Sequence, residues 1–598
     1  MMEDIDFEEF DEVFSRERYR RVAGELLRKM VREFSYEELI DPEKVEGPET
    51  EDGWSVYRFS LGDAVYRFRG RERYWDSVMV EPGSVEVDRD GGFRDAYDPF
   101  EMVSDLETAV EMSGLTAGHL AEEYLHTVLA DLHIDASPSR EVLDMGYGEI
   151  ECEMRGHPWI TFNKGRIGWS YDDFLKYAPE RRNPVRLDWC AVSRENAEFA
   201  SLDVTHDELM ESELGGQFGE FREEISSRGL DPDRYYLLPV HDYQWSNAVV
   251  PLYLEQIANR EVVPLGTGDD RYLPMQSVRT FVNIDDTAKC NVKVPMMIKN
   301  TLVWRGLPGE RTLTAPVMTE YVKNIRDNDP FLTEDCGLVL PGEIAGLNCS
   351  QQAFDRLESP PYQFLETLGC IWRESLTEIV DKDEKPITLS ALLHVDDGEP
   401  LVSELIERSG LSVQEWLHEL FDATLPPLLH YLYRYGTVFS PHGQNAILVL
   451  EDCTPSRLAV KDFVDDVNVS EHPIKELENL PEDLRSVLRT EPPEGLCWFI
   501  VHGLFVGVLR YLSDVLTRHH CYPEKKFWRQ VYETVLRYQE RFPELEDRFD
   551  LFDLFQPCFT KLCLNRNRIT DYGYGSRDGR PHATEYGTVA NPLHRFDG

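Results

Sequence analysis

The chain runs for 598 residues with no internal repeat and no long linker. Repeat architectures would show a period of about 20–50 residues, and the sequence has none. At roughly 100–200 residues per domain, this length corresponds to three or four domains or subdomains. Because no long linker separates them, we expect these subdomains to pack closely against one another.

Acidic residues dominate the charge of the chain. It contains 111 Asp and Glu against 62 Lys and Arg, a formal net charge of −49. A surface of this sign repels phosphate backbones and anionic lipid, so we expect no nucleic-acid partner and no membrane partner. Hydrophobic residues make up 41% and aromatic residues 11%, which suits a globular protein and argues against disorder.

Lysine is scarce even among the basic residues, because only 15 of the 62 are Lys. Excess carboxylates with few lysines suit a protein that must stay hydrated in molar salt, where the Debye length is about 3 Å. We therefore expect a salt-adapted source of the haloarchaeal type, with a salt-filled cytosol. An ordinary acidic cytosolic protein is the alternative interpretation.

The chain start and the cysteines both indicate a cytoplasmic protein. Met1 to Glu9 is acidic, whereas the first part of a secretory signal peptide is basic. The most apolar stretch, Leu496 to Leu509, has 14 residues, fewer than the roughly 20 that span a bilayer, and predicts a buried helix. The 11 Cys are scattered without a C-x-x-C pair, which favours reduced thiols over disulfides. A zinc cluster around His519, His520 and Cys521 is the alternative.

Hydrophobic periodicity predicts an α+β fold in three sections, 1–150, 151–380 and 381–598. The first combines helices with a small sheet, the second mixes strands with loops, and the third is largely helical. The predicted segments are helices at about 16–34, 98–112, 117–132, 413–435 and 497–518, strand-rich stretches within 53–79 and 279–305, and a strand at 235–240. Pro426-Pro427 should kink or break the fourth helix.

A β-hairpin is predicted in the third section, with strands at 445–450 and 457–461. In the register that follows, Asn445 lies directly opposite Asp462, with Cβ atoms about 5 Å apart. An amide oxygen and a carboxylate at this distance could share one Mg²⁺ with phosphate and water. His442, just before the first strand, could reach a phosphate. In the alternative, structural interpretation, Asn445 caps a turn and Asp462 pairs with the preceding lysine.

Common nucleotide-binding and hydrolase motifs are missing, including G-x-x-x-x-G-K-[ST], G-x-S-x-G and H-E-x-x-H. Any anion site must therefore be assembled from dispersed cations. Two segments are basic: 155–169 has three cations and no acid, and 279–305 has five cations and two acids. Because Arg and Lys are the usual ligands of carboxylate and phosphate, these segments predict a pocket for an anionic small molecule. Alternatively, the cations pair with acids elsewhere.

An ordered series of motifs runs from about residue 120 to residue 598. It comprises Gly156-His157-Pro158, Lys164-x-Arg166-x-Gly168, Pro239-Val240-His241, Leu273 to Thr280, Lys293, Thr301, Arg305-Gly306-Leu307, Ile371 to Ser375, His442-Gly443-Gln444-Asn445, Lys461-Asp462-Phe463 and Lys561. This series resembles the IucA/IucC family of NRPS-independent siderophore (NIS) synthetases, with an FhuF-like C-terminal region.

The resemblance implies a fold, a reaction and an assembly. The fold would be a cupped hand with an N-terminal thumb, central fingers and a C-terminal palm distantly similar to protein kinases. The reaction would use ATP and Mg²⁺ to adenylate a carboxylate of citrate or a related di- or tricarboxylic acid, releasing pyrophosphate. An amine or hydroxylamine would then attack to form an amide. A homodimer is also implied.

The resemblance further assigns roles to individual residues. ATP or its metal would contact Ser277, Arg279, Lys293, His442, Gln444, Asn445 and Asp462, with Asn445 and Asp462 as metal ligands. The carboxylate substrate would contact His157, Lys164, Arg166, Thr301, Arg305 and Lys561, and the residues closest to the chemistry would be Arg305, His442 and Lys293. One departure is Ile160-Thr161, where the family often carries a second His-Pro, so any role of that histidine is absent.

Two other function classes stay open. A kinase-like phosphotransferase could use the same histidine, asparagine and aspartate, although the chain lacks a Gly-rich phosphate loop and an H-R-D motif. It would produce ADP, whereas the ligase produces AMP and pyrophosphate. A non-catalytic siderophore- or carboxylate-binding protein would bind its ligand without ATP. The identity of the acid and of the amine is not readable from the sequence.

Overall fold

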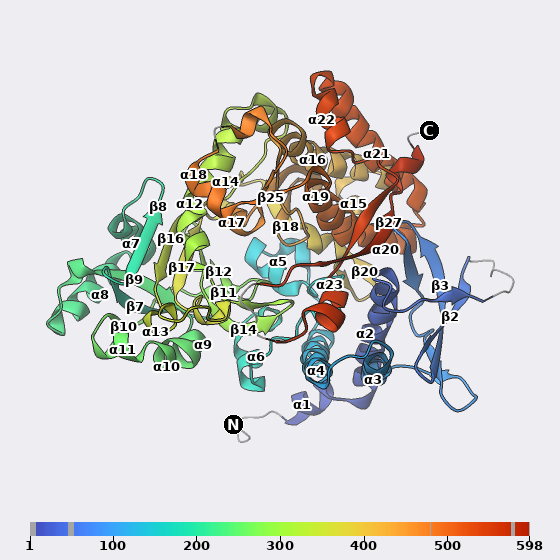
Figure 1. The fold of residues 1–598 in the computed structure, drawn as a ribbon, viewed down its shortest axis with the longest axis horizontal. Helices are drawn as coiled ribbons and strands as arrows, with labels where there is room; N and C mark the ends of the chain where they lie inside the picture. Colours follow the sequence, from blue (N-terminus) through green and yellow to red (C-terminus); the bar gives the residue numbers. More distant parts are fainter. Residues whose placement is uncertain (1–6, 46–52, 479, 576–579, 597–598) are drawn as a thin grey trace.

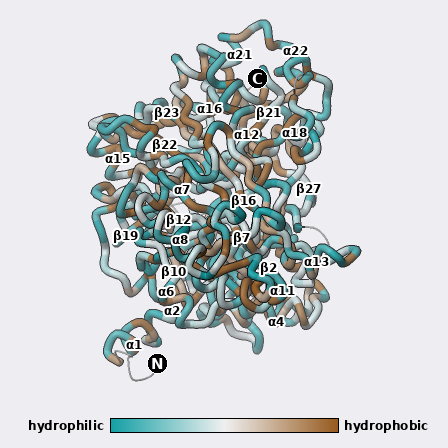
Figure 2. The backbone as a smooth tube through the Cα atoms, turned by 90° about the vertical axis from the view of Figure 1, so that its left-hand side faces the viewer, coloured by the Kyte–Doolittle hydropathy of each residue, from teal (hydrophilic) through white to brown (hydrophobic). Residues whose placement is uncertain are grey.

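The computed structural model describes residues 7–45, 53–478, 480–575 and 580–596. Helices and sheets are mixed throughout this part of the chain (Figure 1). Neighbouring strands are antiparallel except for β24 (Asn468–Ser470) and β25 (Arg489–Glu491), which are parallel. Figure 2 shows hydrophilic segments spread around the outline of the molecule rather than gathered at one end, as the acidic composition requires.

The N-terminal sheet lies beside three helices, at the lower right of Figure 1. Helix α2 (Arg16–Tyr36) begins after Ser15, whose hydroxyl accepts a hydrogen bond from the backbone N–H of Arg18 at 3.4 Å. Strands β2 (Ser55–Leu61) and β3 (Ala64–Arg73) bury every second residue, with β4 (Ser77–Val80) paired to β3; helices α3 (Pro99–Ala109) and α4 (Gly114–Ala136) follow. The helices and the sheet predicted here are confirmed.

Two sheets form the central region, at the left of Figure 1. The smaller has the order β10-β7-β9, with β10 at Val262–Thr267 and β7 at Asp188–Ser193. Its strand β9 (Tyr235–Val240) has the predicted bounds. The larger has the order β11-β12-β13-β17-β16-β8. Its strands are β11 (Tyr272–Pro274), β12 (Thr280–Asn283), β13 (Asn291–Lys293), β17 (Gly369–Arg373), β16 (Glu343–Cys349) and β8 (Ala197–Ser201). Helix α12 (Gly309–Asp327) packs against β16 and β8. The second basic segment begins in this larger sheet, with β12 and β13, and ends in a separate two-stranded sheet of β14 (Met296–Asn300) and β15 (Val303–Arg305).

Helix α16 (Val413–Tyr435) continues through both of its prolines. Of the two outcomes predicted at Pro426-Pro427, the break is wrong, and the kink stays a prediction. Leu425, Leu428 and Leu429 around the prolines are fully or almost fully buried, so tertiary packing maintains the helix where local preference would interrupt it.

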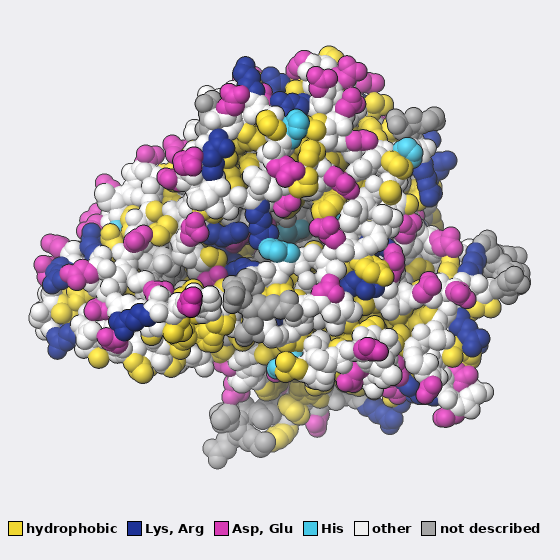
Figure 3. Space-filling model, viewed as in Figure 1, with side chains coloured by type: hydrophobic (Ala, Val, Ile, Leu, Met, Phe, Trp, Pro, Cys, Tyr) yellow, Lys and Arg dark blue, Asp and Glu magenta, His cyan; other side chains and the backbone are white. Residues whose placement is uncertain are grey.

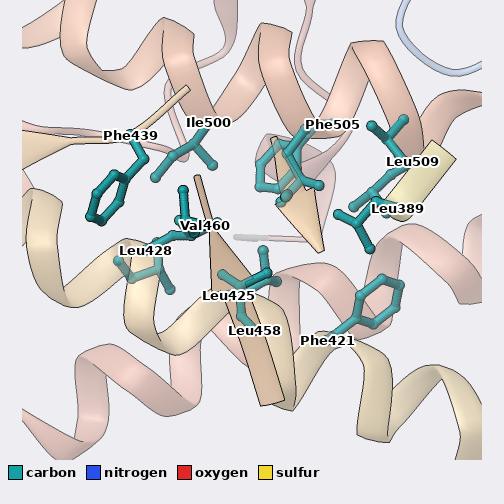
Figure 4. Close-up of a cluster of buried hydrophobic side chains, with 14 of the residues drawn as sticks. Leu389, Phe421, Leu425, Leu428, Phe439, Leu458, Val460, Ile500, Phe505 and Leu509 are labelled. Carbon is teal, nitrogen blue, oxygen red and sulfur yellow. The ribbon is translucent and has the colours of Figure 1, made fainter. Parts of the chain in front are cut away.

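The apolar stretch of the third section lies in a longer helix than predicted. Segments α19 (Pro493–Trp498), η10 (Phe499–Leu509) and α20 (Arg510–His520) are continuous, and η10 is a π-helix. Among the described residues, this 28-residue helix is the one long and apolar enough to cross a membrane, and 83% of its apolar window is buried inside the protein. Figure 4 shows its side chains packed towards α16 across the strand that carries Val460, as expected for a core helix.

The hairpin forms, but its predicted register is wrong by one residue. Strand β22 (Ala446–Glu451) pairs with β23 (Thr454–Val460), with Ala446 opposite Val460. The turn is shorter than predicted because Asp452 and Cys453 both take left-handed conformations, and a bulge follows at Val449/Leu450. Asn445 therefore lies beside Lys461, whose N–H donates to the Asn445 carbonyl at 3.1 Å. A one-residue shift in register turns side chains to the other face.

Candidate active site

A cavity of about 730 Å³ lies between the central and C-terminal regions. Its walls come from the loop around 154–163, from the loops around 276–305, from 440–444 and from the C-terminal segments 489–507 and 562–585. Figure 3 shows a hollow in the middle of the visible face, in which Lys or Arg and His side chains gather. Of the residues predicted for the site, those that line the cavity are His157, Ser277, Thr301, Arg305, His442 and Gln444.

Arg305 is the cation that the structure leaves most available to an anion. It ends strand β15 (Val303–Arg305), and its Nη2 donates to the hydroxyl of Thr301. Its Nε is buried and has no hydrogen-bond partner among the described residues. Burial lowers the pKa of Arg305, and the nearby guanidinium groups of Arg279 and Arg580 lower it further. An anion in the cavity would relieve both effects.

Arg279 and Lys293 lie behind this position in a buried ionic network. The Lys293 ammonium is 3.2 Å from Asp462 and 3.0 Å from Asp465, and Arg279 is 3.5 Å from the same Asp465. Burial opposes the charge of Lys293, but the surrounding carboxylates outweigh it, so the pKa of Lys293 is raised. Both cations therefore stay charged, and Asp465 holds them in place.

His157 and His442 are neutral hydrogen-bonding groups on the cavity wall. Nδ1 of His157 accepts from the backbone N–H groups of Trp159 and Ile160 at 3.2 Å each, so its proton lies on Nε2. Nδ1 of His442 likewise accepts from the N–H of Gln444 at 3.3 Å. Burial lowers the pKa of His157 to about 3 and that of His442 to about 4. Each ring can offer an Nε2–H donor to a phosphate or carboxylate oxygen.

The two predicted metal ligands do not lie opposite each other. Asp462 has a left-handed backbone, and its Oδ1 contacts Lys293 at 3.2 Å and Arg373 at 2.9 Å. The side-chain amide of Asn445 donates instead to Asp466. No group of three or more His, Cys, Asp or Glu suited to a metal occurs among the residues that the structure describes. The predicted pairing of Asn445 directly opposite Asp462 is therefore wrong, because it depended on the incorrect register, and the role of the two residues as metal ligands stays a prediction.

Lys164, Arg166 and Lys561 are buried, but they are absent from the cavity lining in the described part of the chain. Each already has a carboxylate partner: Lys164 pairs with Asp131 at 2.8 Å, Arg166 with Glu180 at 2.5 Å and Lys561 with Glu38 at 2.6 Å. For Lys164 and Arg166, which belong to the first basic segment, the structure agrees with the alternative interpretation that these cations pair with acids elsewhere, and Lys561 is paired as well. Their contact with a carboxylate substrate stays a prediction.

Sequence reasoning missed several groups beside the cavity. Asp465 and Asp466 follow Asp462 by three and four positions, but an acidic pair is inconspicuous in so acidic a chain. Burial, together with the charges of Asp465 and Asp462, raises the pKa of Asp466 well above its ordinary value. Arg580 comes from the far C-terminus and pairs with Glu366, and no local motif marks either residue.

Comparison with known proteins identifies the class to which this fold and site belong. At 40% identity over 98% of this chain and 97% of the relative, the chain is similar to the Rhizobactin siderophore biosynthesis protein RhbF of Rhizobium meliloti. At 27% identity over 97% of this chain and 94% of the relative, it is similar to the citryl-spermidine/3,4-dihydroxybenzoyl-citryl-spermidine:spermidine ligase of Bacillus anthracis. The crystal structure of petrobactin biosynthesis protein AsbB from Bacillus anthracis matches with a TM-score of 0.88 and 25% identity, covering 99% of this chain and 98% of that one. The class is that of the siderophore biosynthesis proteins.

The family follows from profile matches along the chain. The IucA/IucC family profile matches residues 146–394, and the profile described as ferric iron reductase FhuF-like transporter matches residues 414–577. The chain therefore belongs to the IucA/IucC family of siderophore synthetases. The resemblance drawn from the ordered motifs is confirmed at this level.

Proposed function

We propose that the chain is an ATP-dependent siderophore synthetase that joins a carboxylate of citrate, or of a citrate-derived acid, to an amine or hydroxylamine. ATP would convert the carboxylate into an acyl-adenylate and release pyrophosphate. The amine nitrogen would then bond to the acyl carbon while AMP leaves with the electron pair of the broken C–O bond. The relative whose name includes citryl-spermidine and spermidine supports this pairing of acid and amine.

The observation that carries the proposal is the unpartnered Nε of Arg305 beside the cavity. Adenylation brings a carboxylate and an α-phosphate together and spreads negative charge over both. A guanidinium between them, with Thr301 on one side and the N–H donors of His157 and His442 nearby, would stabilise that charge. Arg279 and Lys293 would add longer-range positive charge from behind the wall.

The phosphate side of the site would carry Mg²⁺. A phosphate-bound Mg²⁺ needs only one or two protein oxygens, because phosphates and water complete its shell. Asn445 with Asp466 fits this requirement better than Asn445 with Asp462, whose oxygen already contacts two cations. The raised pKa of Asp466 reflects burial and surplus negative charge, which a divalent cation would relieve. When bound, Mg²⁺ would neutralise charge on the departing pyrophosphate.

Product analysis tests the proposal. Pyrophosphate, AMP and ADP are measured with ATP, Mg²⁺ and molar KCl, using citrate, succinate or no acid, each with and without hydroxylamine. Citrate-dependent AMP and pyrophosphate, with a hydroxamate when hydroxylamine is present, are expected. ADP in their place would favour the kinase-like alternative, and binding of citrate without any nucleotide turnover would favour the non-catalytic one.

A further inference from the structure

The charged groups of the cavity are not distributed evenly around its wall. The lining includes Arg305, which ends the second basic segment, and the two histidines His157 and His442. In the described part of the chain, the cavity lining includes two carboxylates, Glu491 and Glu585, and both belong to the C-terminal segments. The cavity therefore has an anion-binding side and a carboxylate side.

The two glutamates lie near each other and lack a cationic partner. No ion pair joins Glu491 or Glu585 to a lysine or arginine that the structure describes, although Arg489 lies on the same wall, with its Nη1 3.1 Å from His582. Burial raises the pKa of Glu491, the positive charge of Arg489 opposes this rise, and the negative charge of Glu585 adds to it. Two neighbouring carboxylates on a cavity wall constitute a site for a positive charge.

Two aromatic side chains stand on the same wall. Trp498 and Phe499, at the start of the π-helix η10, line the cavity and are partly exposed. Aromatic faces attract ammonium groups within about 6 Å of the ring centre. The chemistry of this wall, carboxylates beside aromatic rings, thus suits a cationic amine with an apolar carbon chain.

His502 provides an independent sign of a nitrogen ligand. It lines the cavity from η10 and is only 4% exposed. Its Nε2 lies 2.8 Å from the carbonyl oxygen of Thr560, so Nε2 carries the proton and Nδ1 carries the lone pair. Nδ1 is buried and has no hydrogen-bond partner among the described residues. An unsatisfied buried acceptor costs free energy, and a ligand in the cavity with an N–H or O–H donor would remove this cost.

The helix is shaped to bring His502 to this place. The backbone widens to a π-helix along Phe499–Leu509, a form that often occurs at functional sites. Gly503, next to His502, lies against the chain that carries His442, since a Cβ added there would be 3.7 Å from the backbone nitrogen of His442. The helix therefore joins the carboxylate side of the cavity to the anion-binding side.

We propose that the C-terminal wall of the cavity is the subsite for the amine nucleophile, and that the nucleophile enters as an ammonium ion. This inference rests on the proposed function. Glu491 and Glu585 would attract the ammonium group, with Trp498 and Phe499 along its carbon chain. Nδ1 of His502 would accept a hydrogen bond from the reacting nitrogen and act as a positioning group.

The reacting nitrogen loses two protons between the bound ammonium ion and the amide product. The ammonium nitrogen releases one proton to solvent and gains its lone pair before it attacks the acyl carbon. After the C–N bond has formed and the bond to AMP has broken, the nitrogen releases a second proton and the neutral amide remains. His502 orients the nitrogen in the first state and is not required to hold either proton.

Binding of 1,4-diaminobutane to the whole chain tests the carboxylate wall without turnover. Isothermal titration calorimetry at about pH 8 would compare the unchanged protein with the double variant Glu491→Gln/Glu585→Gln. We expect roughly tenfold weaker binding in the variant, the effect of losing charge-assisted hydrogen bonds. Glu494→Gln is the matched control, because Glu494 is an exposed neighbour outside the cavity lining. Equal affinity in all three proteins would overturn the proposal.

Hydroxylamine separates this inference from the proposed function. It is uncharged at about pH 8, so it should not depend on Glu491 or Glu585. In the double variant, citrate-dependent pyrophosphate release and hydroxamate formation should stay normal while the KM for 1,4-diaminobutane rises. Absence of pyrophosphate in the unchanged protein would count against the proposed function alone, since the calorimetric result stands without it.

Two variants of His502 test its positioning role. His502→Gln can keep the donor to Thr560 but loses the acceptor at the Nδ1 position, whereas His502→Asn keeps an acceptor near Nδ1 and loses the donor. We expect the Gln variant to raise the KM for the diamine roughly tenfold and the Asn variant to retain most of the affinity. Equal loss in both, or loss of ATP binding, would assign His502 to structure alone and remove it from the subsite.

Discussion

Three cations lie near one cavity, and their partners distinguish their roles: Arg279 and Lys293 are buried, whereas Arg305 is partly buried. Arg279 and Lys293 share Asp465, so their charge is compensated before any ligand arrives. Arg305 has a hydroxyl partner and an unsatisfied Nε. In a chain with 111 acidic residues, a partly buried guanidinium without a carboxylate partner is unusual enough to mark the place where an anion binds.

Replacement of Arg305 by Ala should therefore affect activity far more than stability. We expect citrate-dependent pyrophosphate release to fall about 100- to 1000-fold, the usual effect of removing one preorganised donor from a transition state. The midpoint of urea unfolding should hardly change, because no carboxylate loses its partner. Arg271→Ala is the control, since Arg271 is exposed and pairs with Asp285. Undiminished pyrophosphate release in Arg305→Ala would remove Arg305 from the site.

Asp462→Asn tests the corrected view of the hairpin. Asp462 contacts Lys293 and Arg373, both buried, so the change leaves two cations with less compensation. Breaking a buried pair costs about 3–5 kcal/mol, and Asp465 should limit the loss at Lys293. We expect a lower free energy of unfolding in urea. An unchanged stability together with a much higher Mg²⁺ requirement would instead support Asp462 as a metal ligand.

A glycine allows a helix and a strand near the site to approach each other closely. Helix α12 approaches strand β16 so closely at Gly346 that an added Cβ would lie 2.0 Å from the carbonyl oxygen of Thr312. This contact fixes the helix that follows Arg305 against the sheet that carries Lys293. The atoms that an added Cβ would meet belong to the backbone of α12, which cannot move aside as a flexible side chain can. Position 346 therefore requires glycine.

Gly346→Ala should destabilise the protein by forcing α12 away from β16. Overpacking of this kind costs about 1–3 kcal/mol or more, measured as a lower urea midpoint with an unchanged slope. Gly219→Ala is the matched control, because Gly219 lies within α8 (Gly216–Ser227) and an added Cβ meets nothing within 4 Å. It should stabilise by about 0.5–1 kcal/mol through helix propensity. Equal effects of the two changes would contradict the close approach.

The helices and strands could be predicted from the sequence more accurately than their positions relative to one another. Hydrophobic periodicity located α2, α4 and α16 to within a few residues, since this signal is local. The register of the hairpin was not predictable, because two left-handed residues and a bulge shortened its turn. A shift of one residue moved Asn445 from Asp462 to Lys461. The π-helical widening at His502 likewise has no simple sequence signal.

At the scale of the whole molecule, a segment of the N-terminal region and a segment of the C-terminal region meet beside the cavity. Glu37, just after α2, accepts hydrogen bonds from the backbone N–H groups of Leu564 and Asn565 at 3.1 and 3.0 Å. It also accepts from the indole N–H of Trp159, which lines the cavity, at 2.7 Å. The contacts of Glu37 with Leu564 and Asn565 join residues more than 500 positions apart, so no local pattern could reveal them. Because such long-range contacts are not visible in the sequence, motifs could identify single residues of the site but could not show which cations pair with carboxylates.

Because the formal net charge is −49, we expect the thermal stability of the protein to rise with salt concentration. Carboxylates are scattered over the whole face seen in Figure 3, and their repulsion destabilises the compact state until counterions screen it. We expect the thermal midpoint to rise on the order of 5–10 °C between 0.2 and 2 M KCl and then to level off, because the Debye length is already about 3 Å at 1 M. Sucrose at matched osmolality is the control, since it is excluded from the surface without screening charge. A midpoint that is flat or falls with KCl, while sucrose raises it, would show that the acidic surface is not an adaptation to salt.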